Sequence, residues 1–212
     1  MAWFYYLSRV IIRTLLFLLT RCQVEGRENV PRQGALLVVA NHLSLADPPL
    51  LGVSLGRKMI FMAKKQLFHF PVIGFLVRSF GAFPVRRGQL DRQALRQAYQ
   101  VLADGLALVL FPEGMRSRSG QLRPAFLGAA LIASRSGAPI LPVGISGTKK
   151  LERLSSLLRR PQITVNVGHP FYLPPHRSRL TREELAEFTH YIMQHIAELL
   201  PPEYRGDYAD EN

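Results

Sequence analysis

A histidine and an aspartate five residues apart, His42 and Asp47, form the pattern in this sequence that most readily supports chemistry. Imidazole works as a base near neutral pH, and a carboxylate hydrogen-bonded to one ring nitrogen leaves the other nitrogen free to take a proton. On one continuous helix this spacing would turn the two side chains to different faces, whereas a loop that turns into a helix lets them meet. The alternative is that His42 is an ordinary loop histidine and Asp47 only a helix cap.

The residues around this pair predict a strand, a loop and a helix, in that order. The apolar run 35–40 has the length and β-branched content of a strand. His42 should therefore lie in the loop past the strand end, where open α/β sheets bind their ligands. Asp47 precedes two prolines and two leucines, which is typical of a helix N-cap followed by proline at the first helical position. A carboxylate in that position points back toward the loop that carries His42.

Two further apolar runs end close to arginines. One contains Gly81 and ends at Arg86 and Arg87, and the other leads into Glu113 and Arg116. Guanidinium groups form forked hydrogen bonds to phosphate oxygens, although arginines at strand ends are often merely solvated. Glu113 ends an apolar run, so orienting an arginine or a ligand hydroxyl explains it better than solvation alone.

Strand-like and helix-like runs alternate along the chain, which predicts one α/β domain with a mostly parallel or mixed central sheet flanked by helices. The predicted strands are residues 35–40, 58–63, 80–85, 106–111, 140–145 and 162–167. The predicted helices are residues 48–55, 72–79, 89–103, 124–136 and 181–200, the last starting at a Thr181–Glu184 capping box. Run 138–143 contains Pro139 and Pro142, so it is either an edge strand or the wall of an acyl slot.

The N-terminal stretch is the most apolar part of the chain, but Arg9 and Arg13 lie within it one helical turn apart. Two charges in one span argue against a transmembrane helix and favour an amphipathic helix lying in a membrane interface. Packing of this helix on the core of the domain is the alternative. We therefore expect three parts: residues 1–22 as an interfacial helix, residues 23–200 as the globular domain, and residues 201–212 as an acidic, frayed tail.

The formal net charge of +12 requires a negatively charged partner, and the excess is local. Residues 57–160 hold 18 Lys and Arg against four acidic residues. Phosphate-bearing ligands, an anionic membrane surface and nucleic acid are the candidate partners. The basic residues are not interleaved with stacking aromatics, so we expect no nucleic acid. Cys22 is the only cysteine and no zinc-binding spacing is present, so we expect neither a disulfide framework nor a metal site.

Taken together, four blocks of this sequence resemble the glycerolipid acyltransferase family, specifically the 1-acyl-sn-glycerol-3-phosphate acyltransferases. The blocks occur in the family's order and span about residues 35–145. The first is the Asn-His-x4-Asp block at 41–47, and the second is the block at 81–87 with its terminal arginine. The third is Phe-Pro-Glu-Gly-x-Arg-Ser at 111–117, and the fourth is the proline block at 139–143.

The resemblance implies transfer of a fatty acyl group from a thioester of coenzyme A or acyl carrier protein to the sn-2 hydroxyl of lysophosphatidic acid, which gives phosphatidic acid. No bound cofactor is implied. By the same resemblance His42 is the general base and Asp47 fixes its tautomer. The residues that hold the glycerol phosphate would be Lys64, Arg87, Glu113, Gly114 and Arg116, and those that support the motifs would be Asn41, Gly81, Pro112, Ser117 and Pro142.

Two departures from the family pattern leave the acceptor open. Arg86 stands where relatives often carry an acidic residue, and Met115 replaces a common threonine. The alternatives are acyl transfer to glycerol 3-phosphate or to another lysophospholipid, and a non-catalytic basic module that binds membranes. We expect the protein on the cytoplasmic face of the plasma (inner) membrane, held by its N-terminal helix and its basic surface.

Overall fold

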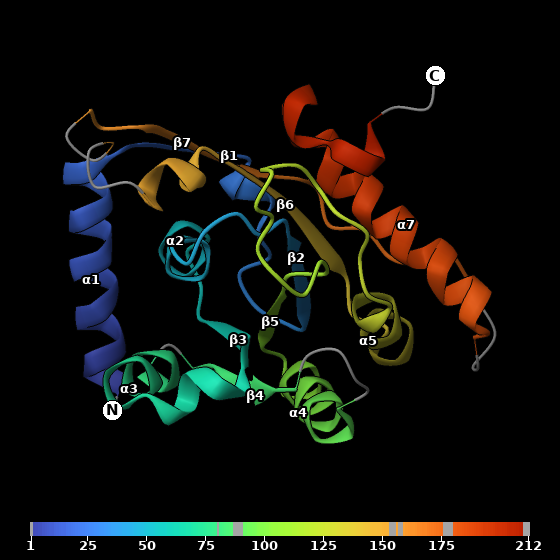
Figure 1. The fold of residues 1–212 in the computed structure, drawn as a ribbon. Coiled ribbons are helices and arrows are strands. Elements are labelled where there is room, and N and C mark those ends of the chain that lie inside the picture. Colours follow the sequence, from blue (N-terminus) through green and yellow to red (C-terminus); the bar gives the residue numbers. More distant parts are fainter. Residues whose placement is uncertain are drawn as a thin grey trace.

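In the computed structural model a seven-stranded sheet forms the centre of the molecule, in the order β1-β7-β6-β2-β5-β3-β4 (Figure 1). The structure describes residues 2–79, 81–86, 91–152, 156, 159–175 and 180–209, without the side chains of 2–9, 17 and 72. Every neighbouring pair of strands is parallel except β6 and β7, which confirms the predicted mixed, mostly parallel sheet. The strands are β1 (Arg21–Glu25), β2 (Leu36–Ala40), β3 (Met59–Lys64), β4 (Phe83–Val85), β5 (Ala107–Leu110), β6 (Ile140–Ser146) and β7 (Gln162–Val167).

Helices cover both faces of this sheet. One face packs on α4 (Arg92–Ala103), α5 (Gly128–Ser136) and α7 (Arg182–Glu198), and the other on α2 (Asp47–Ser54) and part of α1 (Ala2–Leu19) (Figure 1). Strands β2 and β5 lie between these layers, and all their residues are buried. Burial on both faces explains their continuous apolar sequences. Because the two strands are parallel neighbours, the loops after them leave from the same edge of the sheet.

The polar strand β1 was not predicted. Its residues alternate between exposed and half-buried side chains, and it is held by parallel pairing with β7, which lies far away in the sequence. Strand β4 is also shorter than predicted, because Gly81 adopts a left-handed φ of 72° and donates its N–H to the carbonyl of Arg78 at the end of α3 (Pro71–Ser79) instead of starting a strand.

The prolines do not place β6 at an edge of the sheet, since β6 lies between β2 and β7. The carbonyl of Pro142 accepts a hydrogen bond from Gly168, and pairing with β7 begins only at Val143. The N–H that proline lacks therefore falls outside the β6–β7 ladder.

The expectation of a frayed tail is wrong for residues 202–208. This segment forms two 3₁₀ helices, Pro202–Tyr204 and Gly206–Tyr208. Tyr204 and Tyr208 pack against the core beneath α7, and Leu122 donates its N–H to the carbonyl of Tyr204. Two aromatic side chains thus hold a segment whose composition is otherwise polar. Residues 210–212 lie outside the described residues.

Helix α1 packs on the domain at its C-terminal end and presents apolar side chains to solvent along its second half. Leu16 joins the core cluster around α2, whereas Val10, Ile11, Leu15, Leu18 and Leu19 are exposed. Within the described residues, none of the helices combines the length and the apolar character that crossing a membrane requires.

Candidate active site

The loop after β2 is tied to the neighbouring strand by Asn41. Its side-chain amide donates to the carbonyl of Ile145 in β6 over 2.8 Å and accepts the N–H of the same residue over 2.7 Å. Asn41 is buried, so both bonds form in a low-dielectric environment, where polar groups left unpaired are costly. The residue expected only to support the motif therefore fixes where the β2 loop leaves the sheet.

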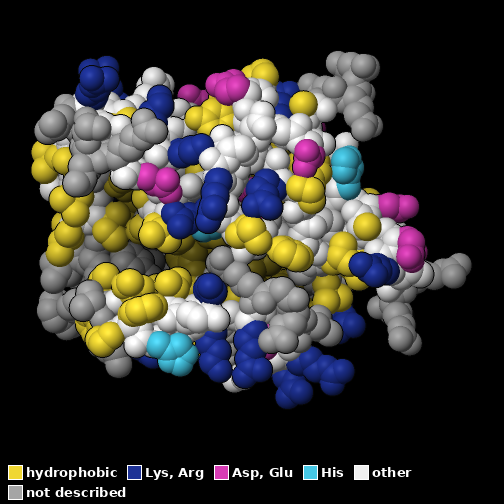
Figure 2. All heavy atoms as spheres, viewed as in Figure 1, with side chains coloured by type: hydrophobic (Ala, Val, Ile, Leu, Met, Phe, Trp, Pro, Cys, Tyr) yellow, Lys and Arg dark blue, Asp and Glu magenta, His cyan; other side chains and the backbone are white. Residues whose placement is uncertain are grey.

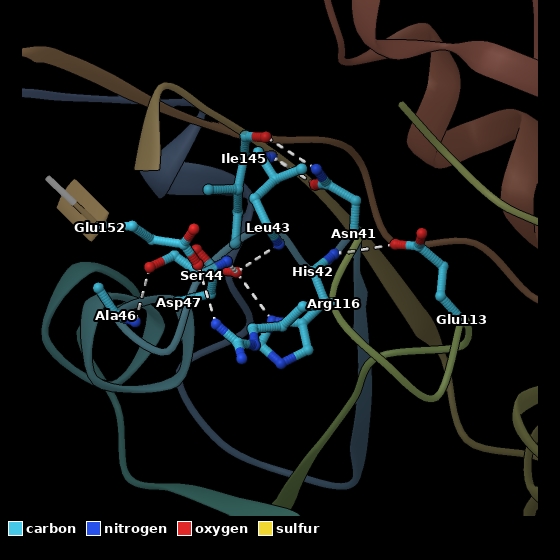
Figure 3. A network of polar contacts seen from close by, with 10 residues as sticks. All are labelled: Asn41, His42, Leu43, Ser44, Ala46, Asp47, Glu113, Arg116, Ile145 and Glu152. Carbon is cyan, nitrogen blue, oxygen red and sulfur yellow. Dashed lines mark hydrogen bonds and ion pairs between the residues drawn. The ribbon is translucent and has the colours of Figure 1, made fainter. Parts of the chain in front are cut away.

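His42 and Asp47 meet as predicted. His42 Nδ1 lies 2.8 Å from Asp47 Oδ2, and the two side chains are 7% and 0% exposed (Figure 3). The backbone N–H groups of Leu43 and Ser44 each donate to the same carboxylate oxygen over 2.7 Å. These donors compensate for the burial of Oδ2 and fix the position of the carboxylate, which in turn orients the imidazole.

The helix begins one residue earlier than predicted. Ala46 is the N-cap of α2, and Asp47 is the first helical residue, followed by two prolines. The carboxylate does not cap the first turn: it reaches back to the loop that precedes the helix. The tight turn from Leu43 to Asp47 directs the N–H groups of Leu43 and Ser44 at Asp47, and the prolines have no N–H that would compete for it.

The side chain of Glu113 links the loop after β5 to the backbone of His42. Its Oε1 accepts the backbone N–H of His42 over 2.9 Å (Figure 3). Its Oε2 accepts the backbone N–H of Arg123 over 3.2 Å. Its hydrogen bonds in this structure thus go to backbone groups of two loops. Burial raises the pKa of Glu113 to about 7, against the opposing effect of these two N–H donors.

The rest of the third block completes the connection between the two loops. The carbonyl of His42 accepts the N–H of Ser117 over 2.7 Å, and Ser117 Oγ accepts the N–H of Gly120. Pro112 is buried, and its carbonyl accepts the N–H of Phe126. Gly114 has a φ of 67° and lies so close to the Phe126 ring that a Cβ would come within 2.7 Å of it. Glycine is therefore required there both for its backbone angle and for the space.

The predicted phosphate-binding cations are placed very differently from the base. Arg116 is exposed and pairs with Glu152 over 2.9 Å. Lys64 ends β3 and is exposed, at the same edge of the sheet as the loop after β5, because β3 and β5 are parallel. Arg87 lies outside the described residues.

Sequence reasoning missed one side chain that touches the base. The Phe111 ring stacks on the imidazole of His42 with ring centroids 4.2 Å apart and an interplanar angle of 23°. This stacking restrains the orientation of the imidazole ring in addition to the contact with Asp47. The signal available was the position of Phe111 at the head of the third block, at the end of the strand that pairs with β2.

This arrangement can activate a hydroxyl group. With Nδ1 engaged by Asp47, the ring nitrogen Nε2 points away from the carboxylate (Figure 3). In the tautomer with the proton on Nδ1, Nε2 carries a lone pair that can accept a proton. Among the described residues, no hydrogen bond joins the His42 ring to a serine or cysteine side chain that it could activate as a nucleophile.

Three comparisons with known proteins bear on this site. The family model described as Acyltransferase matches residues 21–146, which is more than half of the chain. The chloroplastic 1-acyl-sn-glycerol-3-phosphate acyltransferase of Brassica napus is 33% identical over 72% of this chain and 45% of its own length. The 1-acyl-sn-glycerol-3-phosphate acyltransferase of Bacillus subtilis is 27% identical over 89% of this chain and 92% of its own.

The fold agrees with a solved relative. The crystal structure of the 1-acyl-sn-glycerophosphate acyltransferase from Thermotoga maritima superposes with a TM-score of 0.70 and 28% identity, covering 89% of this chain and 76% of that one. This chain spans less than half the length of the Brassica napus relative and of its Arabidopsis thaliana counterpart. The matched segment contains the paired His42 and Asp47, the Glu113 loop and the proline block, and this chain belongs to the acyltransferase family.

Proposed function

We propose that this protein transfers a fatty acyl group from a thioester to the sn-2 hydroxyl of lysophosphatidic acid and so forms phosphatidic acid. The observation that carries the proposal is the buried pair of His42 and Asp47 with Nε2 of the histidine free. The names of the Brassica napus and Bacillus subtilis relatives, both 1-acyl-sn-glycerol-3-phosphate acyltransferases, support the choice of acceptor.

The proposed reaction needs two proton transfers, one from the acceptor hydroxyl to His42 and one from His42 to the departing thiolate. Nε2 of His42 takes the proton of the acceptor hydroxyl as its oxygen attacks the thioester carbonyl. The tetrahedral intermediate then collapses, the new ester C–O bond remains and the C–S bond breaks. The imidazolium returns its proton to the departing thiolate, so the free thiol leaves and His42 is ready for another cycle. Asp47 stabilises the imidazolium and stays ionised throughout.

In this proposal the acceptor's phosphate lies near the exposed cations of the site. Arg116 and Lys64 lie in or beside the loops that leave the same edge of the sheet as His42. A guanidinium that is half exposed can exchange its contact with Glu152 for a phosphate at small cost. The acyl donor is a thioester of coenzyme A or of acyl carrier protein, and the basic surface suits either of these anionic carriers.

Membrane association is part of the proposal, with residues 1–22 as an interfacial anchor on the cytoplasmic face. The exposed apolar side chains of α1 and the positive charge of the chain support it. Vesicle flotation of the full chain and of a variant without residues 1–22 would test it, with release of the shorter variant as the expected result.

An acceptor panel tests the reaction itself. Purified protein would receive labelled acyl-coenzyme A or acyl-carrier protein together with lysophosphatidic acid, glycerol 3-phosphate or lysophosphatidylcholine. We expect phosphatidic acid as the main product with at least one donor. Efficient transfer to glycerol 3-phosphate or to lysophosphatidylcholine, with none to lysophosphatidic acid, would contradict the proposed acceptor.

A further inference from the structure

The segment between Asp47 and Asp91 contains no acidic residue. It carries seven basic residues: Arg57, Lys58, Lys64, Lys65, Arg78, Arg86 and Arg87. In the fold this segment runs from α2 through β3, the 3₁₀ helix η2 (Lys65–His69) and α3 to the edge strand β4. One end of the sheet is therefore built from a continuous stretch of chain with only positive charges.

The same stretch also exposes four large apolar side chains. Phe70, Ile73, Phe75 and Leu76, which we call the α3 patch, are between 44% and 56% exposed. Figure 2 shows hydrophobic side chains gathered at the lower left of the molecule, in the region of α3, with basic and histidine side chains beside them. Contiguous exposed apolar side chains with a polar rim are typical of interaction surfaces.

The packing of α3 explains why these side chains face outward. Gly74 is buried in α3, and a Cβ at that position would come within 2.7 Å of the carbonyl oxygen of Phe68 in η2. The helix therefore sits close on η2 through a glycine, and this contact has no room for a larger side chain. Ile73, Phe75 and Leu76 of the same helix stay between 44% and 51% exposed.

Next to the α3 patch lies a recess that suits an anionic group. It has a volume of about 330 Å³, and Lys65, His69 and Arg78 line it together with Phe68 and Phe83. Arg78 donates to the carbonyl of Phe68 over 3.2 Å and lies 5.5 Å from the centre of the Phe68 ring. These contacts hold the guanidinium beside the recess, where a phosphate could bind it.

We propose that the α3 patch and this recess dock on an anionic phospholipid bilayer, as a second contact separate from residues 1–22. Apolar side chains flanked by cations are the composition of a helix that lies in a membrane interface. Phe70, Ile73 and Leu76 enter the acyl boundary, while Lys65 and Arg78 meet the lipid phosphates. A soluble acidic protein would account for the cations but not for large aromatic and aliphatic side chains that are about half exposed beside them.

Vesicle binding by the full chain tests this proposal without any thioester, so its outcome is independent of acyl transfer. The test variant carries Phe70→Ser, Ile73→Ser and Leu76→Ser, and the matched control is Tyr172→Ser, which removes a side chain that is 65% exposed elsewhere. With vesicles of phosphatidylglycerol and phosphatidylcholine we expect the triple variant to bind at least tenfold more weakly, and the control to bind within twofold of wild type. Equal binding by the triple variant and wild type would overturn the proposal.

The basic side chains give a second comparison. Lys65→Gln should weaken binding to these vesicles several-fold and leave the weaker binding to pure phosphatidylcholine unchanged. Lys150→Gln, which also removes an exposed lysine, should change neither. A Lys150→Gln effect as large as that of Lys65→Gln would mean that only the net charge matters, which would contradict a defined docking surface.

A fluorescent label reports directly whether α3 enters the lipid. In a Cys22→Ala background, an environment-sensitive dye on Leu76→Cys should shift to the blue and become protected from an aqueous quencher when anionic vesicles are added. The same dye on Tyr172→Cys should do neither. A dye at residue 76 that stays open to the quencher on vesicles, or that is shielded by acyl carrier protein and not by lipid, would overturn the proposal. Circular dichroism and thermal melting show whether each variant is folded.

Discussion

The candidate base and the candidate phosphate ligands occupy opposite environments although both lie past the ends of parallel strands. The imidazole of His42 is 7% exposed, and its partner Asp47 is held by three N–H donors, two of them from the backbone. Arg116 is 44% exposed, and it pairs with the equally exposed carboxylate of Glu152. The candidate base is therefore held in place by the fold, whereas the candidate phosphate ligand Arg116 is free to rearrange.

This difference follows from what each contact has to do. A base must be in position when the hydroxyl attacks, so any misplacement raises the barrier directly. A phosphate contact has only to form when the acceptor binds, and an exposed ion pair worth about 0–1 kcal/mol is easily exchanged for it. We expect substitutions in the two regions to differ accordingly in size and in kind.

The largest effect should come from the base itself. His42→Ala should lower the rate of acyl transfer about 10²- to 10⁴-fold, because general-base assistance is typically worth that much. Asp47→Asn should lose less, since the base remains while its tautomer and orientation are less well fixed. The exposed His169→Ala is the matched control and should keep wild-type activity. Near-normal turnover by folded His42→Ala would refute the assignment.

Loss of the Asn41 amide should reduce stability more than loss of an amide outside the site. Asn41→Ala removes two hydrogen bonds and leaves the N–H and carbonyl of Ile145 unpaired, so we expect a cost of roughly 2–4 kcal/mol in the free energy of unfolding. Asn29→Ala removes a single bond, to the carbonyl of Val167, and should cost about 1 kcal/mol or less. Urea unfolding of both variants measures the difference, and equal costs would argue against a special role for Asn41.

Glu113 should make stability depend on pH in the direction opposite to that of an ordinary paired carboxylate. Burial raises its pKa from 4.5 to about 7, so the folded protein favours the protonated form. This contribution is complete below pH 4.5 and is lost as the pH rises to 7; it amounts to roughly 3 kcal/mol. Unfolding at pH 5 and pH 7.5 should show the loss in wild type and a smaller one in Glu113→Gln. An unchanged pH dependence in the variant would contradict the assignment.

The smallest effect should be that of the exposed arginine. Arg116→Gln should raise the KM for lysophosphatidic acid by about tenfold and leave the KM for the thioester nearly unchanged, since it removes one charged contact to the phosphate. Arg118→Gln removes a neighbouring exposed arginine and should change neither value by more than twofold. A selective effect of Arg116→Gln on the thioester would mean that the two substrate sites are exchanged.

The parts of the site that were predictable from sequence are those formed by residues close together in the chain. His42 and Asp47 are separated by one short loop, and a continuous apolar run gave the strand before it, so local patterns were sufficient. The role of Asn41 was not visible, because its partner Ile145 is 104 residues away. The same applies to Glu113, which contacts a backbone group 71 residues away. A sequence pattern suggests that a residue matters but does not identify such distant partners.

The strands with apolar sequences were predicted correctly. A polar strand that is held by pairing with a strand distant in the sequence was not predicted. Strands β2, β5 and β7 occur within or at their predicted bounds. Strand β1 has charged and polar residues at alternate positions and depends on β7 for its hydrogen bonds. The C-terminal segment looked like a frayed tail because its charges dominate the composition, yet Tyr204 and Tyr208 anchor it on the core.

The most direct test of the central claim is a single-turnover experiment with excess protein and a labelled acyl thioester, quenched before and after addition of lysophosphatidic acid. If His42 acts as a base on the acceptor hydroxyl, the label stays on the thioester until the acceptor is added and then appears in phosphatidic acid, one molecule for each thioester consumed. His42→Ala should remove this second step. Label bound covalently to the protein before the acceptor arrives, or thioester consumed without phosphatidic acid, would contradict the account.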